Sequence, residues 1–307
     1  MTLSISTQVF DNVDDLPNEK WGLGFYGKSL DERGRCAIES IADRSIKSIE
    51  IDHRFSNESQ IYSINGSEVG SPVKHLQSLI KKNSKNKRVL LDATTLGLPE
   101  IAAICLSIKQ LPDLECALTI LYIEPHDYKR KSGEARKFHL STDRKFSNII
   151  GLTLDTTQLD PGTVIAFLGF EPERLAHFEE QFPATGWDGM AFFGVPAFKA
   201  GWESDAYTAN VPTLSKRDAN IAWDVNFCSA NSVSAAYFEL MKKAEGRDLN
   251  ERPFLFLPIG TKPHGIAAVL FCCEHSYGRS GITYDHPVRI EKRTEQIGKS
   301  HLYHIAF

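Results

Sequence analysis

The chain has 307 residues, of which 42% are hydrophobic and 24% are charged. These values are typical of a folded protein, and the length exceeds what one hydrophobic core usually serves, so we expect two domains. The formal net charge of −4 does not suggest the net basic face of a strong nucleic-acid footprint, and it leaves a local basic patch as the alternative.

The first half of the chain alternates apolar runs with helical patterns. Strands are predicted at residues 21–26, 48–53, 88–93 and 117–124, and helices at residues 31–42, 73–82 and 99–109. This alternation is typical of βαβ units around a mostly parallel sheet.

A polar segment at residues 127–145 follows, and then the pattern restarts. Strands are predicted at residues 163–170, 190–195 and 253–259, helices at 173–182, 232–244 and 264–273, an irregular insertion near 201–223, and a closing antiparallel strand pair at 288–292 and 301–307. We therefore expect an α/β protein of two tandem Rossmann-like halves with mostly parallel sheets, residues 1–150 and 151–307.

The two halves also match each other in sequence. Gly24-Phe25-Tyr26 aligns with Gly169-Phe170-Glu171, and the segment 90–95 aligns with 256–261. An internal duplication explains both matches with one assumption, whereas the alternative is the general similarity of any two βαβ units.

Targeting, membrane and metal features are not visible in the sequence. The first ten residues lack the basic start and apolar core of a signal peptide, and the longest apolar stretch, residues 266–273, is too short to span a bilayer. The six cysteines form no C-x-x-C pair and have no histidine at zinc-ligand spacing. We expect a cytoplasmic protein with buried thiols, no membrane contact and no metal.

Candidate ligand residues are those that follow the strands, because ligands of open parallel sheets bind beyond the carboxyl ends of the strands. Helix N-termini there favour anions such as phosphate. The residues selected on this basis are Asp92, Thr94 and Thr95 in the first half, and Arg174, Gly260, Thr261, Lys262 and His264 in the second. Ordinary helix capping is the alternative role for each hydroxyl residue.

A second candidate is the segment from Gly22 to Ser29. It fits the P-loop pattern G-x-x-x-x-G-K-[ST], with Gly27, Lys28 and Ser29 as phosphate-binding residues and Asp92 on Mg²⁺. The same glycines fit the dinucleotide fingerprint G-x-G-x-x-G. Both motifs require a preceding buried strand, but the segment 16–20 is polar and contains Pro17.

The strand-end motifs resemble those of the CARF superfamily, the Rossmann-like sensor domains of prokaryotic antiviral defence. Asp92-Ala93-Thr94 and Gly260-Thr261-Lys262 carry the likeness, and two fused units resemble a SAVED domain. Leu98 stands where the family has a basic residue, and Pro258 replaces the acid in the second half. The resemblance implies a cyclic oligonucleotide ligand, a role against phage, and a protein partner that carries the effector.

Three functions follow as hypotheses. The first is a sensor subunit that binds a nucleotide-like small molecule and signals to a protein partner. The second is an enzyme that uses a P-loop or a dinucleotide, whose catalytic residues and cofactor the sequence does not identify. The third is a structural subunit of a larger assembly, which docks through aromatic residues in 192–223: Phe193, Phe198, Trp202 and Tyr207.

Overall fold

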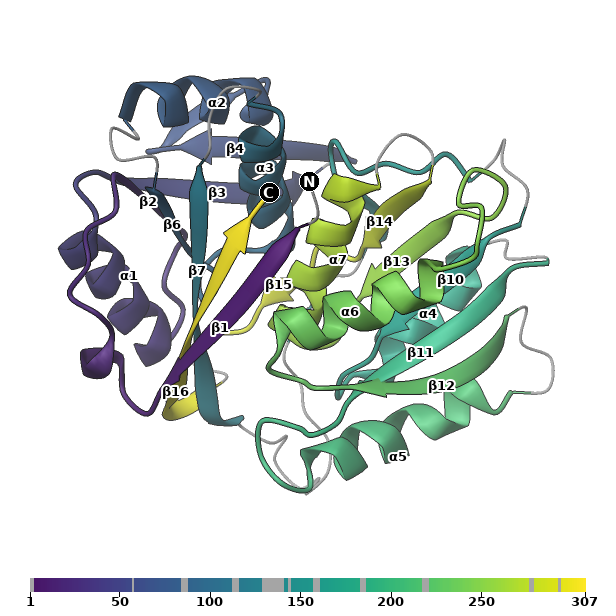
Figure 1. Ribbon diagram of the computed structural model, residues 1–307. Helices are drawn as coiled ribbons and strands as arrows, with labels where there is room; N and C mark the ends of the chain where they lie inside the picture. Colours follow the sequence, from purple (N-terminus) through teal and green to yellow (C-terminus); the bar gives the residue numbers. More distant parts are fainter. Residues whose placement is uncertain are drawn as a thin grey trace. The chain divides into compact units, whose positions relative to one another are not determined.

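The structure is a computed structural model that describes residues 3–56, 58–83, 88–111, 116–128, 141–142, 145–156, 161–182, 186–216, 221–275, 279–291 and 294–307. The chain divides into two units. Unit 1 consists of Met1–Lys129 and Ile290–Phe307, and unit 2 of Arg130–Arg289. Each unit is an α/β structure built around its own main sheet (Figure 1).

Unit 1 contains an eight-stranded sheet with the strand order β1-β16-β7-β6-β2-β3-β4-β5. The central strands β7, β6, β2 and β3 are parallel, and the outer strands are antiparallel to their neighbours. Its elements are β1 (Ser4–Phe10), a 3-10 turn (Val13–Asp15), β2 (Leu23–Tyr26), α1 (Glu32–Arg44), β3 (Ser48–Ser56), β4 (Ser59–Ile64), β5 (Ser67–Val69), α2 (Pro72–Asn83), β6 (Arg88–Asp92), α3 (Leu98–Lys109), β7 (Ala117–Tyr128) and β16 (Thr294–Ala306).

Unit 2 contains a six-stranded sheet with the strand order β12-β11-β10-β13-β14-β9. All of its strands except β9 are parallel. Its elements are β8 (Ser141–Thr142), β9 (Ser147–Asn148), β10 (Thr163–Phe167), α4 (Pro172–Gln181), β11 (Asp188–Gly194), α5 (Trp202–Leu214), β12 (Ala222–Cys228), α6 (Val233–Ala244), β13 (Phe254–Pro258), α7 (Lys262–Glu274), β14 (Ser280–Tyr284) and β15 (Val288–Arg289), which pairs with β8.

Helices cover both faces of each parallel core, as its apolar strands require. In unit 2, α6 and α7 lie on one face and α4 and α5 on the other (Figure 1). The central strand β13 is buried along its whole length, and so is the central strand β10. Continuous apolar runs of this kind are the pattern from which the strands were predicted. The predicted βαβ alternation is confirmed. Among the described residues, no helix is both long and apolar enough to cross a bilayer.

The two units have the same arrangement of central strands. β7-β6-β2-β3 in unit 1 corresponds in order and direction to β14-β13-β10-β11 in unit 2. The sequence alignment of Gly24 with Gly169 is shifted, because Gly24 lies inside β2 whereas Gly169 follows β10. Gly27 is the matching position: a Cβ there would lie 3.1 Å from the Thr95 carbonyl oxygen, and a Cβ on Gly169 would lie 3.3 Å from that of Ile259.

The C-terminal strand pair is a wrong prediction. β16 lies between β1 and β7 of unit 1 and is antiparallel to both, while β15 pairs with β8 of unit 2. The two segments predicted to pair thus belong to different units. Unit 1 is not one continuous stretch ending at residue 150, because the C-terminal segment from Ile290 returns to it after unit 2. The cause is a partner strand far away in the sequence, which alternation of apolar residues does not identify.

The prediction of an irregular insertion near 201–223 is also wrong, because helix α5 occupies most of this segment. Two of the four aromatic residues expected to dock a partner there, Phe193 and Trp202, are buried. Phe198 is half-buried, and only Tyr207 is exposed, at 43%. The helix was hard to predict because Pro212 lies inside it and its apolar residues do not gather on one face.

Gly24 allows α1 to pack closely on β2, which gives a test of the fold of unit 1. A Cβ on Gly24 would meet the Ser45 hydroxyl and lie 2.6 Å from Ile41 Cγ2. We expect Gly24→Ala to lower the free energy of unfolding by about 1–3 kcal/mol through overpacking. Gly70→Ala is the control, because no atom lies within 4 Å of a Cβ there. Urea unfolding of both variants measures the difference, and equal stabilities would contradict the packing.

Candidate functional site

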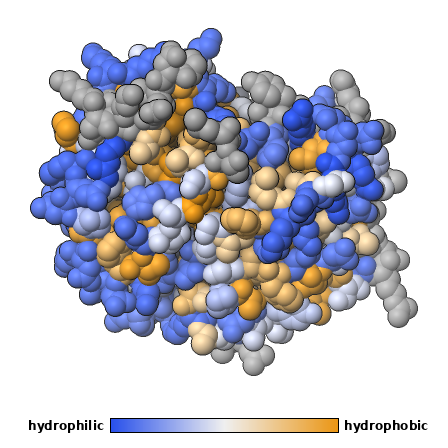
Figure 2. Space-filling model, viewed as in Figure 1, coloured by the Kyte–Doolittle hydropathy of each residue, from blue (hydrophilic) through white to orange (hydrophobic). Residues whose placement is uncertain are grey.

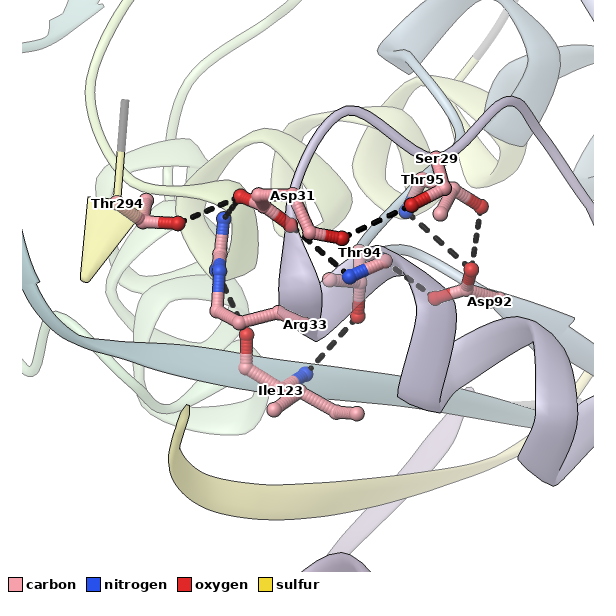
Figure 3. Close-up of polar contacts among 9 residues, drawn as sticks. Ser29, Asp31, Arg33, Asp92, Thr94, Thr95, Ile123 and Thr294 are labelled. Atoms are coloured by element: carbon pink, nitrogen blue, oxygen red, sulfur yellow. Dashed lines mark hydrogen bonds and ion pairs between the residues drawn. The ribbon is translucent and has the colours of Figure 1, made fainter. Parts of the chain in front are cut away.

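In unit 1, a residue that the sequence selected as a ligand residue, Thr95, links the carboxyl ends of β2 and β6. Figure 3 shows Thr95 and Thr94 beside Asp92. The Gly27 N–H donates to Thr95 Oγ1 at 2.8 Å, and the Thr95 hydroxyl donates to Asp92. Asp92 is fully buried and also accepts from the Thr94 N–H at 2.7 Å and the Thr95 N–H at 3.3 Å. Burial raises the pKa of Asp92, and the hydrogen bonds from Thr95 and Thr94 oppose that rise. Asp92 therefore holds the turn after β6.

Thr94 and Arg33 hydrogen-bond to backbone groups of β7 beyond the point where β6 ends. Strand pairing between β6 and β7 stops at Asp92 and Leu121. Two residues further on, the Ile123 N–H donates to Thr94 Oγ1 at 3.0 Å, and Arg33 Nη1 donates to the Ile123 carbonyl oxygen at 2.8 Å. Without these side chains the backbone groups of Ile123 would be buried without partners.

Asp31 lies at the centre of a polar group that the sequence did not single out. Its carboxylate caps α1 by accepting from the Gly34 N–H at 2.9 Å, and it also accepts from Arg33 Nη2 at 3.2 Å and from the Thr294 hydroxyl at 2.6 Å (Figure 3). Burial alone would raise the pKa of Asp31, but Arg33 and the other donors lower it overall. The helix start was visible in the sequence, whereas the contact with Thr294 depends on the position of β16 in unit 1, which was not predicted.

The segment from Gly22 to Ser29 does not form a phosphate-wrapping loop. Residues 23–26, which would form the loop in both glycine motifs, form strand β2 instead. Lys28 is 61% exposed and pairs with Asp52 at 2.9 Å, and the Ser29 hydroxyl donates to the Asp31 carbonyl oxygen. α1 begins only at Glu32, after both residues. The P-loop and dinucleotide interpretations of Gly27, Lys28 and Ser29 are therefore not supported by the backbone.

In unit 2, the carboxyl ends of the two central strands meet at glycines. β10 is flanked by β11 on one side and β13 on the other, so the direction of strand succession reverses between β10 and β13. A Cβ on Gly260, after β13, would lie 2.8 Å from the Leu168 carbonyl oxygen, after β10. A Cβ on Gly169 would in turn lie 3.4 Å from Gly260 Cα. Glycine at position 260 allows the backbones to come this close, and a Cβ on Gly169 would make a tight contact, 3.3 Å from the Ile259 carbonyl oxygen.

Thr261 and Lys262 begin helix α7 directly above these glycines. Thr261 is the N-cap residue, but its hydroxyl donates to the Ala230 carbonyl oxygen at 2.8 Å, and in the described structure its side chain makes no capping hydrogen bond. Lys262 is the first helical residue, and the first turn contains no acidic residue. The charged side chain of the first turn thus has the same sign as the partial positive charge of the helix N-terminus.

The helices α2 and α6 also have no acidic residue in the first turn, and Ser232 caps α6. The other helix starts that follow the selected residues carry acids. α1 is capped by Asp31, α3 has the buried Glu100 in its first turn, and α4 has Glu173. These carboxylates occupy the electrostatic position that an anionic ligand would take. Of the candidate positions in the described structure, the start of α7 is thus the one best suited to a phosphate.

His264 lies in the first turn of α7 but is fully buried. Its Nε2 lies 3.0 Å from the Ser229 carbonyl oxygen, which can only accept, so we place the proton on Nε2. The ring stacks on Phe167 with centroids 4.8 Å apart. Burial lowers the pKa of His264 to about 4, so the ring is neutral at pH 7. His264 positions α7 against the ends of β10 and β12.

The buried neutral His264 predicts a loss of stability in acid. Its pKa in the folded protein, about 4 against an unfolded value of 6.5, means that the unfolded state takes up the proton first. Stability from this group is complete above pH 6.5 and falls as pH drops towards 4, by about 3 kcal/mol in total. We expect His264→Gln to reduce the difference in free energy of unfolding between pH 7 and pH 4.5, and the exposed His75→Gln to leave it unchanged. Urea titrations at both pH values measure it, and an unaltered difference in His264→Gln would contradict the assignment.

Arg174 belongs to the interior of unit 2. Its Nε and Nη2 donate to the two carboxylate oxygens of Asp285, both at 2.6 Å, and its Nη1 donates to the Ile259 carbonyl oxygen at 2.8 Å. Arg174 and Asp285 are both buried. The arginine ties α4 to the segments that follow β13 and β14, and its direct contact with a ligand stays a prediction.

The structure thus brings the selected residues together in two sets, each within its own unit: Asp92, Thr94 and Thr95 with Gly27 in unit 1, and Gly260, Thr261, Lys262 and His264 in unit 2. That both sets contact one ligand stays a prediction. Comparison of the chain with models of known protein families and with curated proteins finds no match. The assignment of function therefore depends on the geometry of these two strand edges.

Proposed function

We propose that the chain is a ligand-binding sensor subunit made of two Rossmann-like units, and that it binds a nucleotide-type ligand at the carboxyl edge of the unit 2 sheet. The ligand phosphate contacts the N-terminus of α7 and Lys262, next to Gly260 and Thr261. The charge of this helix start carries the proposal: the first turn of α7 has a lysine and no acidic residue, at a helix N-terminus whose own partial charge is positive.

Topology supports the same position. The strand order β12-β11-β10-β13-β14 follows the order 3-2-1-4-5 of a doubly wound sheet, and in such sheets ligands bind where the direction of succession reverses. Gly260 lies at that point, so the backbone can approach a phosphate closely. The resemblance of Gly260-Thr261-Lys262 to CARF motifs makes cyclic oligonucleotides the first ligands to test, and defence against phage the setting.

Calorimetry with cyclic di-, tri- and tetra-adenylates, and with ATP, tests the proposal. We expect one of them to bind, and Lys262→Ala to raise the dissociation constant about tenfold or more, because a hydrogen bond to a charged group contributes about 1.5–3 kcal/mol.

Lys216→Ala is the matched control. It removes the same charge from unit 2, but from an exposed position after the C-terminus of α5, which is at the amino edge of the sheet. Binding that Lys216→Ala weakens as much as Lys262→Ala would contradict the site. Absence of binding by every probe, with a folded sample, would contradict the function.

A further inference from the structure

Strand β12 leaves one side of the unit 2 sheet without a partner strand. It is the outermost strand and pairs with β11 on its inner side. The Cys228 carbonyl oxygen points inward, since it accepts from the Val195 N–H at 2.8 Å. Backbone groups alternate along a strand, so those of Trp223, Val225 and Phe227 point outward. In the described structure no other strand pairs with this side.

β12 also has few of the features by which proteins usually protect sheet edges, and Asp224 is its one charged residue. It is seven residues long, its sequence Ala222–Cys228 contains no lysine and no proline, and its pairing with β11 shows no bulge. Natural edge strands are commonly short, bulged, or marked by charge or proline. A strand of this kind accepts another strand readily.

Exposed apolar side chains lie beside this edge. Val225 is 40% exposed, Phe227 is 55% exposed, and Tyr207 on α5 is 43% exposed. The buried Phe193 contacts both Phe227 and Tyr207, with ring centroids 6.4 Å and 5.3 Å away, so the group is continuous with the core. Apolar surface lies over β12 and α5 at the lower right of the space-filling view (Figure 2).

We propose that β12 pairs with β12 of a second copy of this chain, antiparallel about a two-fold axis at Val225. The two central valines then exchange both backbone hydrogen bonds, and so do Trp223 and Phe227 of the partner subunit. Centring the axis on Val225 pairs the strand along its whole length and joins the two unit 2 sheets into one.

The side chains of β12 complement themselves in this register. On one face, Trp223 lies opposite Phe227 of the partner subunit, an aromatic cross-strand pair of the favourable kind. On the other face, Asp224 lies opposite the neutral Asn226 of the partner subunit, so the single charge of the strand meets no like charge. An axis at Asp224 would instead place two carboxylates opposite each other. Charge thus favours a second copy in the Val225 register.

Sedimentation equilibrium of the whole chain tests the proposal, with Val225→Lys as the disrupting variant. The lysine stem fits an exposed edge position, but the two-fold axis brings the two ammonium groups together. We expect the native chain to dimerise and Val225→Lys to raise the dimer dissociation constant at least about tenfold, with an unchanged circular dichroism spectrum. Amide hydrogen exchange of residues 222–228 should slow as the native protein is concentrated.

Val9→Lys is the matched control, because Val9 is a 51% exposed valine on β1, the edge strand of unit 1. It should leave the dissociation constant unchanged. A native chain that stays monomeric, or a dimer that Val225→Lys does not weaken, or one that Val9→Lys weakens equally, would each overturn the proposal. The test needs no ligand, so its outcome is separate from that of the proposed function.

Discussion

Replacing Asp285 with asparagine is expected to lower the free energy of unfolding of unit 2 by about 3–5 kcal/mol. Asp285 is fully buried and holds Arg174 through two hydrogen bonds of 2.6 Å. Burial alone would lower the pKa of Arg174, but Asp285 raises it overall, so the guanidinium stays charged. In the Asp285→Asn variant the positive charge of Arg174 stays buried, but the negative charge of Asp285 that compensates it is removed.

Asp188→Asn provides a control with the same chemistry at the surface. Asp188 also accepts from an arginine, Arg252, at 2.6 Å, but both side chains are more than half exposed. Exposed pairs contribute little, so its effect should stay within about 0.5–1 kcal/mol. Urea unfolding followed by tryptophan fluorescence suits the comparison, because Trp187, Trp202 and Trp223 all lie in unit 2. Similar losses in both variants would show that Asp285 is not the buried anchor described above.

The parallel cores were predictable because their information is local. The apolar run at residues 89–91 is followed by a turn and an apolar helix, so it needs no distant partner to be recognised as part of a buried strand. The same holds for β10 and β13, and for the helices between them. Strand ends then located the candidate site, since parallel strands share one carboxyl edge.

The C-terminal strand shows where local information ends. β16 is a strand in either arrangement, but its partners are β1 and β7, more than a hundred residues earlier. Alternation gives the two faces of a strand and not its neighbour. The missed partner also concealed Thr294, which reaches Asp31 only because β16 lies in unit 1.

The site residues were found by position, whereas their roles needed coordinates. Asp92 ends a buried strand and Lys262 follows one, so the strand-end rule selected both of them. The structure separates them: Asp92 is fully buried and bonded to its own turn, while Lys262 is half-exposed at a helix start without acids. Burial and hydrogen-bond partners decide this difference, and neither can be read from a strand-end motif.

That difference leads to the second large effect, expected for Asp92→Ala. Truncation leaves the Thr94 N–H, the Thr95 N–H and the Thr95 hydroxyl without their acceptor in the buried turn. Each unsatisfied buried group costs about 1–3 kcal/mol, so we expect unit 1 to lose about 3–5 kcal/mol of unfolding free energy. Asp92→Asn keeps one acceptor oxygen and should lie between the alanine variant and the native protein.

Asp248→Ala is the control for Asp92→Ala, because it removes a similar side-chain to backbone hydrogen bond at an exposed position. Asp248 accepts from the N–H of the residue two positions on, as Asp92 does, but it is exposed, so water replaces the lost bond and the effect should be much smaller. Hydrogen exchange of the amides after β6 in Asp92→Ala would locate the loss at the turn. If instead Asp92→Ala unfolds like the native protein and only ligand binding is lost, Asp92 is a ligand residue whose carboxylate the fold does not need.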